Sequence, residues 1–565
     1  MKIHNHILPH ILLSLIATVS LACRGEDAAH ARAVPRPGWR LLYNNDTTNI
    51  LTCASPYHQA GEDRFTDGMV RATVDEAAVP GVDAMALMPG LGRVPWWPSK
   101  IYPMAEHEAW FQARYGVKPH FIIDDYLMAG GDYIKVFVDE CHKKGVAALI
   151  AYRLNDGHML EDADGHPKPV EVETISRYYV EHPEFRLERK STGYGGVGVE
   201  NWLHPEIPAR RLALITELLE NYDLQGMELD FMRFPRYFPT GTPMPEKVAV
   251  MGKFLGEVRA ALDRTAKGGR RRYLGVRVDC NSDGWAATGF DPATFRAAGV
   301  DYFNLSPASN STQQTSIAAV RRAVPGERLY FEEGPSPQNW PLIAGYDGVD
   351  FRRNAAEMLE STARLAYRRG ADGISLFNFA YYRSFGQAPE RRGPFNEPLF
   401  QTIPLLADPA TLDHTPGYYY RSVNESQFHE IKGVTDVGAL PGQPYHYTMD
   451  MVPPTGNPEG RLRLQVVTVA ESRAGEGEPP VDTDRGRWQV KLNGLVLSPA
   501  SDPVAAYPFP TSIRAGFGHA NQYLAWQVPA GLAIDGINQV DITFLEGPSA
   551  LRLRWIEIFS CSPAP

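Results

Sequence analysis

Between Gly38 and about Leu406, short apolar runs alternate with longer segments in which apolar residues recur every three to four positions. The first pattern is typical of buried strands and the second of amphipathic helices. The predicted strands are Arg40–Asn45, Val82–Met88, Val146–Leu154, Gly226–Met232, Leu274–Cys280, Tyr302–Ser306, Arg328–Glu333 and Gly373–Asn378. Eight strands that alternate with helices predict parallel pairing and closure into a (β/α)8 TIM barrel.

The helices and the loops of this region carry their own signals. Asp132–Lys144 and Asn354–Arg369 are predicted helices, and each is followed by a glycine, which suits the position after a helix end. The predicted fifth helix, Pro292–Ala298, is short. The connections from strand to helix are long, above all Pro89–Gly131 and Asn155–Ile207. Such loops usually carry function, and in barrels they lie at the C-terminal ends of the strands.

After about Asp408 the pattern changes to short alternating segments separated by Gly, Pro, Asp and Asn. The predicted strands are Arg461–Val469, Arg487–Leu497, Leu524–Val528, Gln539–Leu545 and Leu551–Ser560. Thr415–Tyr420 and Pro441–Pro454 are predicted to be linkers or loops. Without a helical period, this pattern predicts an all-β jelly-roll-like sandwich domain. The predicted organisation is a barrel over residues 38–420 and a β-sandwich over residues 421–565.

The first 22 residues have the pattern of an export signal. Lys2 precedes an apolar run from Ile7 to Leu21, and small residues stand before Cys23. Cys23 favours a lipoprotein held in the outer or cell-surface membrane by a lipid anchor. Ser20 stands where a lipobox prefers leucine, so plain export to the periplasm or the medium is the alternative. Residues 23–37 are predicted to be a tether.

Charge and motifs argue against several classes of function. The net charge of −10 provides no basic footprint for nucleic acid. The sequence has no H-E-x-x-H motif, clustered His/Cys set or spaced-oxygen calcium loop, so we expect no metal. It also has no G-x-S-x-G elbow and no dinucleotide-binding glycine motif after the first strand, so we expect no cofactor. The oligomeric state is left open.

Polar residues gather at the predicted C-terminal ends of the barrel strands. They are Asn44, Asn45 and Asp46; Arg153, Asn155, Asp156 and His158; Glu228, Asp230 and Arg233; Asp279, Asn281 and Asp283; Glu332 and Glu333; and Asn378, Tyr381 and Tyr382. Hydrolysis of a glycosidic bond requires two carboxyl groups on opposite sides of the bond. Acids from the fourth and seventh strands would face each other across the barrel mouth.

Glu228 and Asp230 are two residues apart, so they share one face of the fourth strand and cannot be the opposed pair. We expect Asp230 and Glu333 to be the catalytic pair, with Glu228 as a supporting acid. Alternation turns only one of Glu332 and Glu333 inward, so Glu332 is the alternative. The predicted substrate-binding residues are Asn45, Asp46, Trp97, Arg153, Asn155, Asp156, His158, Arg233, Asp279, Asn281 and Asn378.

Several of these residues also suit a purely structural role. The acids of the fourth strand could form an ion pair with Arg153, Arg233 or Arg277. The Asn155-Asp-Gly157 stretch is equally typical of a turn, and Trp97 could pack its long loop. If the arginines bind substrate, they indicate an anionic sugar, because guanidinium pairs well with carboxylate and sulfate.

The stretch Gly226-Met-Glu-Leu-Asp-Phe-Met-Arg-Phe-Pro235 resembles the fourth-strand motif of the family-ten-like glycosyl hydrolases, which are bacterial glycosidases with a (β/α)8 barrel. Arg40–Asp46, Tyr152–His158 and Asp408–Leu412 are similar to the same group, and the likeness covers roughly residues 38–420. The resemblance implies that the barrel is catalytic, with Asp230 as the leading catalytic carboxylate and a seventh-strand glutamate as the second. The C-terminal sandwich resembles the carbohydrate-binding modules that are often attached to such barrels.

The sequence therefore predicts a glycoside hydrolase that acts on a polysaccharide or oligosaccharide. One alternative is a non-catalytic glycan-binding surface lipoprotein that keeps the barrel as a scaffold, because fold does not guarantee activity. A second alternative is a lyase that uses Tyr381, Tyr382 or His158 as a base.

Overall fold

The computed structural model describes residues 36–52, 64–116, 122–158, 175–188, 198–308, 311–335, 354–382, 398–421, 437–438, 440–468, 486–500, 522–547 and 551–560. The predicted signal peptide, the lipid-anchor candidate Cys23 and nearly all of the predicted tether lie outside these ranges. Within them, no helix combines the length and the apolar character needed to cross a membrane.

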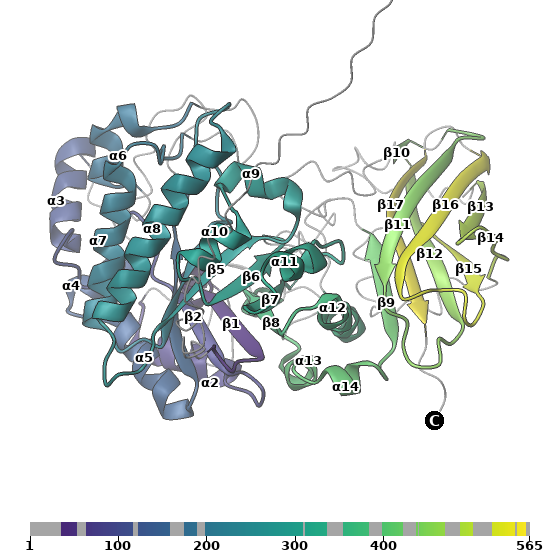
Figure 1. The fold of residues 1–565 in the computed structure, drawn as a ribbon, viewed down its shortest axis with the longest axis horizontal. Helices are drawn as coiled ribbons and strands as arrows, with labels where there is room; N and C mark the ends of the chain where they lie inside the picture. The colour runs from purple at the N-terminus through teal and green to yellow at the C-terminus, as the bar shows by residue number, and fades with distance from the viewer. Residues whose placement is uncertain are drawn as a thin grey trace, which may run out of the picture. The chain divides into compact units, whose positions relative to one another are not determined.

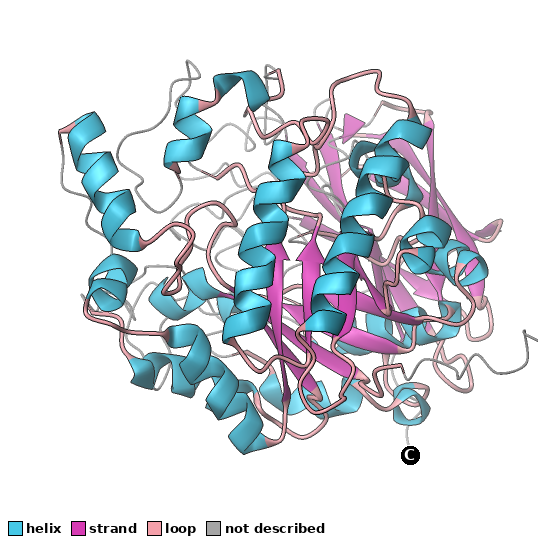
Figure 2. Ribbon diagram, turned by 60° about the vertical axis from the view of Figure 1, so that its left-hand side comes forward, coloured by secondary structure: helices cyan, strands magenta, loops and turns pink. Residues whose placement is uncertain are grey.

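Eight parallel strands close into a barrel in sequence order (Figure 1). They are β1 (Leu41–Asp46), β2 (Ala84–Met88), β3 (Ala147–Arg153), β4 (Gly226–Asp230), β5 (Tyr273–Asp279), β6 (Tyr302–Ser306), β7 (Arg328–Glu333) and β8 (Gly373–Phe377). Helices flank the barrel strands (Figure 2). The predicted (β/α)8 barrel is confirmed, with strand boundaries within a few residues of those predicted.

The described helices follow the predicted alternation. They are α1 (Thr47–Thr52), α2 (Asp67–Ala77), α3 (Met104–Tyr115), α4 (Ile122–Met128), α5 (Tyr133–Lys144), α6 (Arg177–Glu181), α7 (Glu206–Asn221), α8 (Met244–Arg264), α9 (Trp285–Thr288), α10 (Pro292–Ala297), α11 (Ile317–Ala323), α12 (Ala356–Arg369), α13 (Ile403–Leu406) and α14 (Pro409–Leu412). Gly145 and Gly370 cap α5 and α12 with φ values of 73° and 109°, which glycine adopts at little cost.

The barrel interior changes from apolar to polar along its strands. Side chains near the N-terminal ends form an apolar cluster that includes Leu42, Leu149, Tyr302 and Tyr330. Residues one position away along the same strands, such as Phe331, belong instead to the large core that includes helix residues. Two residues further along the inward face, polar groups replace the apolar ones. This change of chemistry places the candidate site at the C-terminal end of the barrel.

The C-terminal region forms two antiparallel sheets, which confirms a β-sandwich. The strands are β9 (Gly417–Arg421), β10 (Val437–Gly438), β11 (Pro444–Met451), β12 (Gly460–Thr468), β13 (Arg487–Leu492), β14 (Leu495–Val496), β15 (Gln522–Val528), β16 (Gly536–Glu546) and β17 (Leu551–Ser560). One sheet has the order β10-β17-β12-β15 with β9 beside β17, and the other has the order β11-β16-β13-β14. Asn493 and Gly494, both at positive φ, form the turn between β13 and β14.

Two predicted loop regions are strands. The tyrosine-rich Thr415–Tyr420 stretch lies mostly in β9, which pairs with β17, so the sandwich begins before residue 421. Pro441–Pro454 contains β11, which pairs with β16 along eight residues. Pro444 occupies the first position of this edge strand, where a missing backbone N–H does little harm. The Gly and Pro residues around both stretches hid the alternating pattern.

Candidate active site

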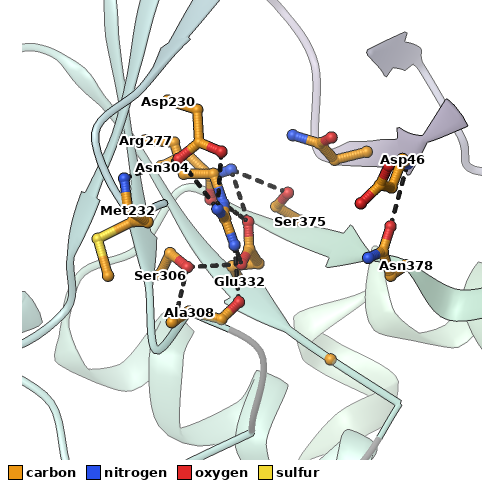
Figure 3. Close-up of polar contacts among 12 residues, drawn as sticks. Asp46, Asp230, Met232, Arg277, Asn304, Ser306, Ala308, Glu332, Ser375 and Asn378 are labelled. Atoms are coloured by element: carbon orange, nitrogen blue, oxygen red, sulfur yellow. Dashed lines mark hydrogen bonds and ion pairs between the residues drawn. The ribbon is translucent and has the colours of Figure 1, made fainter. Parts of the chain in front are cut away.

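A single buried guanidinium joins acids from two barrel strands that are not neighbours (Figure 3). Arg277 Nη1 lies 3.0 Å from Asp230 Oδ1 on β4. Its Nε and Nη2 lie 2.7 Å and 2.6 Å from the two carboxyl oxygens of Glu332 on β7. All three side chains are at most 1% exposed. One guanidinium and two hydrogen bonds therefore separate the two carboxyl groups.

Strand register explains why these residues meet. Arg277 is the neighbour of Asp230 across the β4–β5 pair and of Asn304 across the β5–β6 pair. Asn304 Nδ2 lies 3.2 Å from Glu332 Oε2, and Ser306 Oγ donates to Glu332 Oε1 at 2.6 Å. Two side chains of β6 thus supply further donors that hold Glu332 in a fixed orientation.

Glu228 lies beneath this pair and keeps its proton near neutral pH. Asn44 Nδ2 donates to Glu228 Oε1 at 2.7 Å, and Asn304 Nδ2 lies 3.2 Å from Oε2. Burial, followed by the neighbouring charge of Glu332, raises the pKa of Glu228 to about 8. Asp230 and Glu332 therefore contact the Arg277 guanidinium, and the adjacent Glu228 is neutral at pH 7.

The predicted choice between Glu332 and Glu333 is corrected by the strand's alternation. Tyr330 belongs to the inner apolar cluster and Phe331 to the outer core, so Glu332 points into the barrel and Glu333 points outward. Neither carboxyl oxygen of Glu333 has a hydrogen-bond partner among the described residues. Burial raises the pKa of Glu333 well above its ordinary value. The expected inward acid of β7 is therefore Glu332 and not Glu333.

A second charged cluster lies at the ends of β1 and β3. Arg153 Nη2 contacts Asp46 Oδ2, and Arg153 Nη1 donates to Asp156 Oδ2 at 2.9 Å. Asp156 Oδ1 lies 2.6 Å from His158 Nδ1, and the His158 side chain is 24% exposed. Burial alone would raise the pKa of Asp156, but the charges of His158 and Arg153 outweigh it and lower that pKa. The structure thus brings four of the predicted substrate-binding residues into one cluster: Asp46, Arg153, Asp156 and His158.

The two clusters meet around an aromatic ring. The Arg277 guanidinium lies 4.0 Å from the centroid of Phe377, at the end of β8, and the Arg233 guanidinium lies 5.9 Å from the same centroid. Burial, followed by the charge of Arg153, lowers the pKa of Arg233. Asp46 and Asp156 act in the opposite direction. The charges of the Arg153 cluster therefore also act on the Arg233 guanidinium.

The remaining predicted substrate-binding residues make contacts within the protein. Trp97 Nε1 donates to Glu217 on α7, and Asn155 Nδ2 donates to the backbone carbonyls of Glu200 and Arg236. Asp279 accepts a hydrogen bond from the Asn281 amide. Asn378 Oδ1 accepts hydrogen bonds from the Asp46 amide and from Asn49 Nδ2. Asn45 lies between the inward-facing Asn44 and Asp46, so strand alternation turns it outward. These contacts fix the exits of the strands, and a role in substrate binding stays a prediction for each residue.

Sequence reasoning missed most of the inward polar residues below the rim. The sequence does not indicate a site role for Asn304, Ser306 or Ser375, and it indicates Arg277 only as an ion-pair partner. Ser375 Oγ lies 3.2 Å from Asn304 Nδ2. The two-residue period of a strand is the signal that could have found Arg277, because Arg277 stands two residues before Asp279 and so lies on the same face of β5.

Backbone strain gathers at the same rim. Phe234, Ala308 and Asn378 have φ values of 51°, 74° and 51°, and they follow β4, β6 and β8. Asparagine tolerates this conformation, whereas for other residues it costs roughly 1–2 kcal/mol. Strained backbone of this kind concentrates at functional sites, which agrees with the position of the buried acids.

The fold and site define a (β/α)8-barrel protein with a buried carboxyl cluster. No protein-family model matches the chain, and no curated protein matches it. Solved structures with a similar chain path include an alpha-L-fucosidase isoenzyme from Paenibacillus thiaminolyticus, with 12% identity and a TM-score of 0.37; the match covers 66% of this chain and 49% of the fucosidase, so the chain spans about half of that protein's length. An Anoxybacillus alpha-amylase has 12% identity, a TM-score of 0.36 and coverages of 93% and 99%. The PgaB (BpsB) glycoside hydrolase domain from Bordetella bronchiseptica has 11% identity, a TM-score of 0.38 and coverages of 63% and 97%.

Proposed function

We propose that this protein is a glycoside hydrolase in which Asp230 and Glu332 are the catalytic carboxyl pair. The observation that carries the proposal is the arrangement of these two acids on β4 and β7 at two ends of the Arg277 guanidinium. Glycosidases place their two carboxyl groups about 5 to 9.5 Å apart. A separation of one guanidinium and two hydrogen bonds is compatible with that range.

The charge balance of the cluster supports the same chemistry. Asp230 and Glu332 contact one guanidinium, and the adjacent Glu228 is protonated near neutral pH because its pKa is raised to about 8. The cluster thus contains three carboxyl groups and one guanidinium, so acidic groups outnumber basic ones. Fixed negative charge stabilises the oxocarbenium-like transition state of glycosidic cleavage.

The second cluster favours a neutral sugar over an anionic one. Arg153, which the sequence offered for a uronate or sulfated sugar, contacts both Asp46 and Asp156. Asp46 and Asp156 also act on Arg233. Among the described residues, the arginines of this rim are therefore matched by carboxylates, so we propose a polysaccharide or oligosaccharide of neutral sugars as the substrate.

The test compares adjacent glutamates on one strand. Asp230→Asn and Glu332→Gln should lower hydrolysis by about 10²–10⁴-fold, because each removes a carboxyl group from the reaction. Glu333→Gln is the matched control and should retain activity, since Glu333 faces away from the barrel interior. Neutral and anionic polysaccharides are incubated with each protein, and the anomeric protons are followed by NMR.

Two outcomes would contradict the proposal. Equal loss of activity in the Glu332 and Glu333 variants would remove the assignment of the pair. A wild-type protein that binds a glycan without producing new reducing ends would instead support the alternative of a non-catalytic glycan-binding protein.

One observation favours a second candidate, a polysaccharide lyase. The His158 ring is the partly exposed member of the second cluster, and its Nδ1 lies 2.6 Å from Asp156 Oδ1, which would orient Nε2 to act as a base. A lyase would release unsaturated products, and His158→Asn would abolish them while Asp230→Asn would not. Saturated products from the wild-type protein would eliminate this candidate.

A further inference from the structure

The loop between β6 and α11 connects the Arg277 cluster to the sandwich. Near its start, the Ala308 carbonyl accepts from Arg277 Nη2 at 2.7 Å, and the Ala308 amide donates to Ser306 Oγ at 2.9 Å. Ala308 is held at a φ of 74°, so its carbonyl is directed at Arg277 by a strained backbone. At the other end, the Ser316 amide donates to the Cys280 carbonyl, directly after β5, at 2.8 Å. Residues 309 and 310 lie outside the described ranges.

Gln313, in the middle of this loop, is bound to the first strand of the sandwich. Its Nε2 donates to the Tyr418 carbonyl at 2.9 Å and to Thr362 Oγ1 on α12 at 3.0 Å. Its Oε1 accepts from the Tyr420 amide at 2.8 Å. The side chain is 1% exposed, and each donor and acceptor of its amide is used.

The geometry of β9 explains why an amide side chain fits there. Tyr418 and Tyr420 are two residues apart, so the carbonyl of one and the amide of the other project from the same edge of the strand. Among the described strands, β9 pairs only with β17, which leaves one edge for Gln313. The Gln313 side chain thus pairs with β9 as the backbone of a neighbouring strand would.

The same loop is also fixed to the exit of β7. Ser311 Oγ donates to the Gly334 carbonyl at 2.9 Å, and Asn354 Nδ2 donates to Ser311 Oγ at 2.7 Å. Gly334 follows directly after the strand that carries Glu332. The loop therefore contacts Arg277 on one side and the strand end behind Glu332 on the other.

We propose that Gln313 is a positioning residue for the carboxyl pair. By binding the loop to β9, it holds the Ala308 carbonyl against Arg277, and Arg277 in turn orients Asp230 and Glu332. On this basis the sandwich supports the active site directly and is more than an attached binding module. The kinetic consequence rests on the proposed glycosidase function, whereas the structural consequence does not.

The experiment uses adjacent glutamines in the full-length chain. Gln313→Met removes all three hydrogen bonds at similar side-chain size. Gln314→Met is the matched control, because Gln314 is only half-buried and its Nε2 has no hydrogen-bond partner among the described residues. At temperatures below the unfolding midpoint of the variant, Gln313→Met should lower kcat by about 10- to 100-fold with little change in KM, because small displacements of catalytic groups have effects of this size.

Hydrogen exchange provides a readout that does not depend on activity. The amides of Ala308 and Ser316 should exchange faster in Gln313→Met than in the wild-type protein and in Gln314→Met. Gln313→Glu, which retains the acceptor for Tyr420, should show a smaller increase and serves if Gln313→Met does not fold. Unchanged loop exchange overturns the inference, as does a lowered unfolding temperature with unchanged kcat. A wild-type protein without hydrolase activity would remove the proposed function, while the exchange data would still decide the role of Gln313.

Discussion

Among the described residues, an arginine–carboxylate cluster in the sandwich and one in the barrel are both buried, and the two differ in charge balance. In the sandwich, Arg463 Nε contacts Glu557 Oε1, and both side chains are 0% exposed. Neutral donors cover the rest of the carboxylate: Trp555 Nε1 donates to it at 2.6 Å, and the Tyr418 hydroxyl donates to it as well. One positive charge faces one negative charge, which is how a buried ion pair is usually tolerated.

The barrel cluster is not balanced in this way. Arg277 faces Asp230 and Glu332, and Glu228 lies just below them with its pKa raised to about 8. Excess acid in a buried site costs stability, and perturbed acids of this kind concentrate at functional sites. Both clusters are equally buried, but only the barrel cluster has more carboxyl groups than guanidinium groups. We therefore interpret the sandwich cluster as a structural ion pair and the barrel cluster as the candidate catalytic site.

The largest expected effect comes from removing the arginine of each cluster. Arg277→Met and Arg463→Met should each lower the free energy of unfolding by about 3–5 kcal/mol, because each leaves buried carboxylate without its partner. Only Arg277→Met should also abolish glycan hydrolysis in the fraction that stays folded. Urea unfolding gives the first quantity, and NMR of the anomeric protons on folded protein gives the second. Loss of hydrolysis in folded Arg463→Met would erase the distinction between the clusters.

The next effect is a dependence of stability on pH that the barrel cluster predicts. The pKa of Glu228 is about 8 in the folded protein against an ordinary 4.5, so between these values the unfolded chain releases a proton that the folded protein keeps. Stability should therefore fall as pH rises through this window, by up to about 1.4 kcal/mol per pH unit from this group. Glu228→Gln should make the decline shallower in urea unfolding at pH 5, 6.5 and 8. An unchanged slope would show that Glu228 is ionised in the folded protein.

The sequence predicts the barrel well because its signal is repeated along the chain. Strand and helix periods alternate eight times, and glycines such as Gly145 and Gly370 mark helix ends by a local requirement for positive φ. The sandwich is predicted less completely, because β9 and β11 lie among Gly and Pro residues that hide a period of two over a short strand. Pairing partners far along the chain, β17 and β16, decide that these segments are strands.

For the candidate site, the sequence predicts the region of the barrel in which it lies but not all of the residues that form it. Tyr330 and Phe331 are both aromatic, so the local pattern of β7 does not show which face is inward, and the choice between Glu332 and Glu333 depends on barrel closure. The sequence does not mark Arg277 as a site residue, because Arg277 lies one inward position below the strand end. Its role follows from the register of β4 with β5, which no local pattern contains.

The smallest predicted effect concerns Glu333, a buried acid that belongs to neither cluster. Its carboxyl group has no hydrogen-bond partner among the described residues, and burial raises its pKa well above the ordinary value. Glu333→Met should raise the free energy of unfolding by about 1–3 kcal/mol, because an apolar side chain removes the penalty of an unsatisfied polar group. The gain should increase as the pH rises above the ordinary pKa of a glutamate, because burial raises the pKa of Glu333 in the folded protein and the unfolded chain therefore loses this proton first. Urea unfolding at pH 5 and pH 8 measures this difference. Stabilisation with full hydrolysis would place Glu333 outside the site, whereas destabilisation at both values would show that the carboxyl group has a partner that this strand face requires.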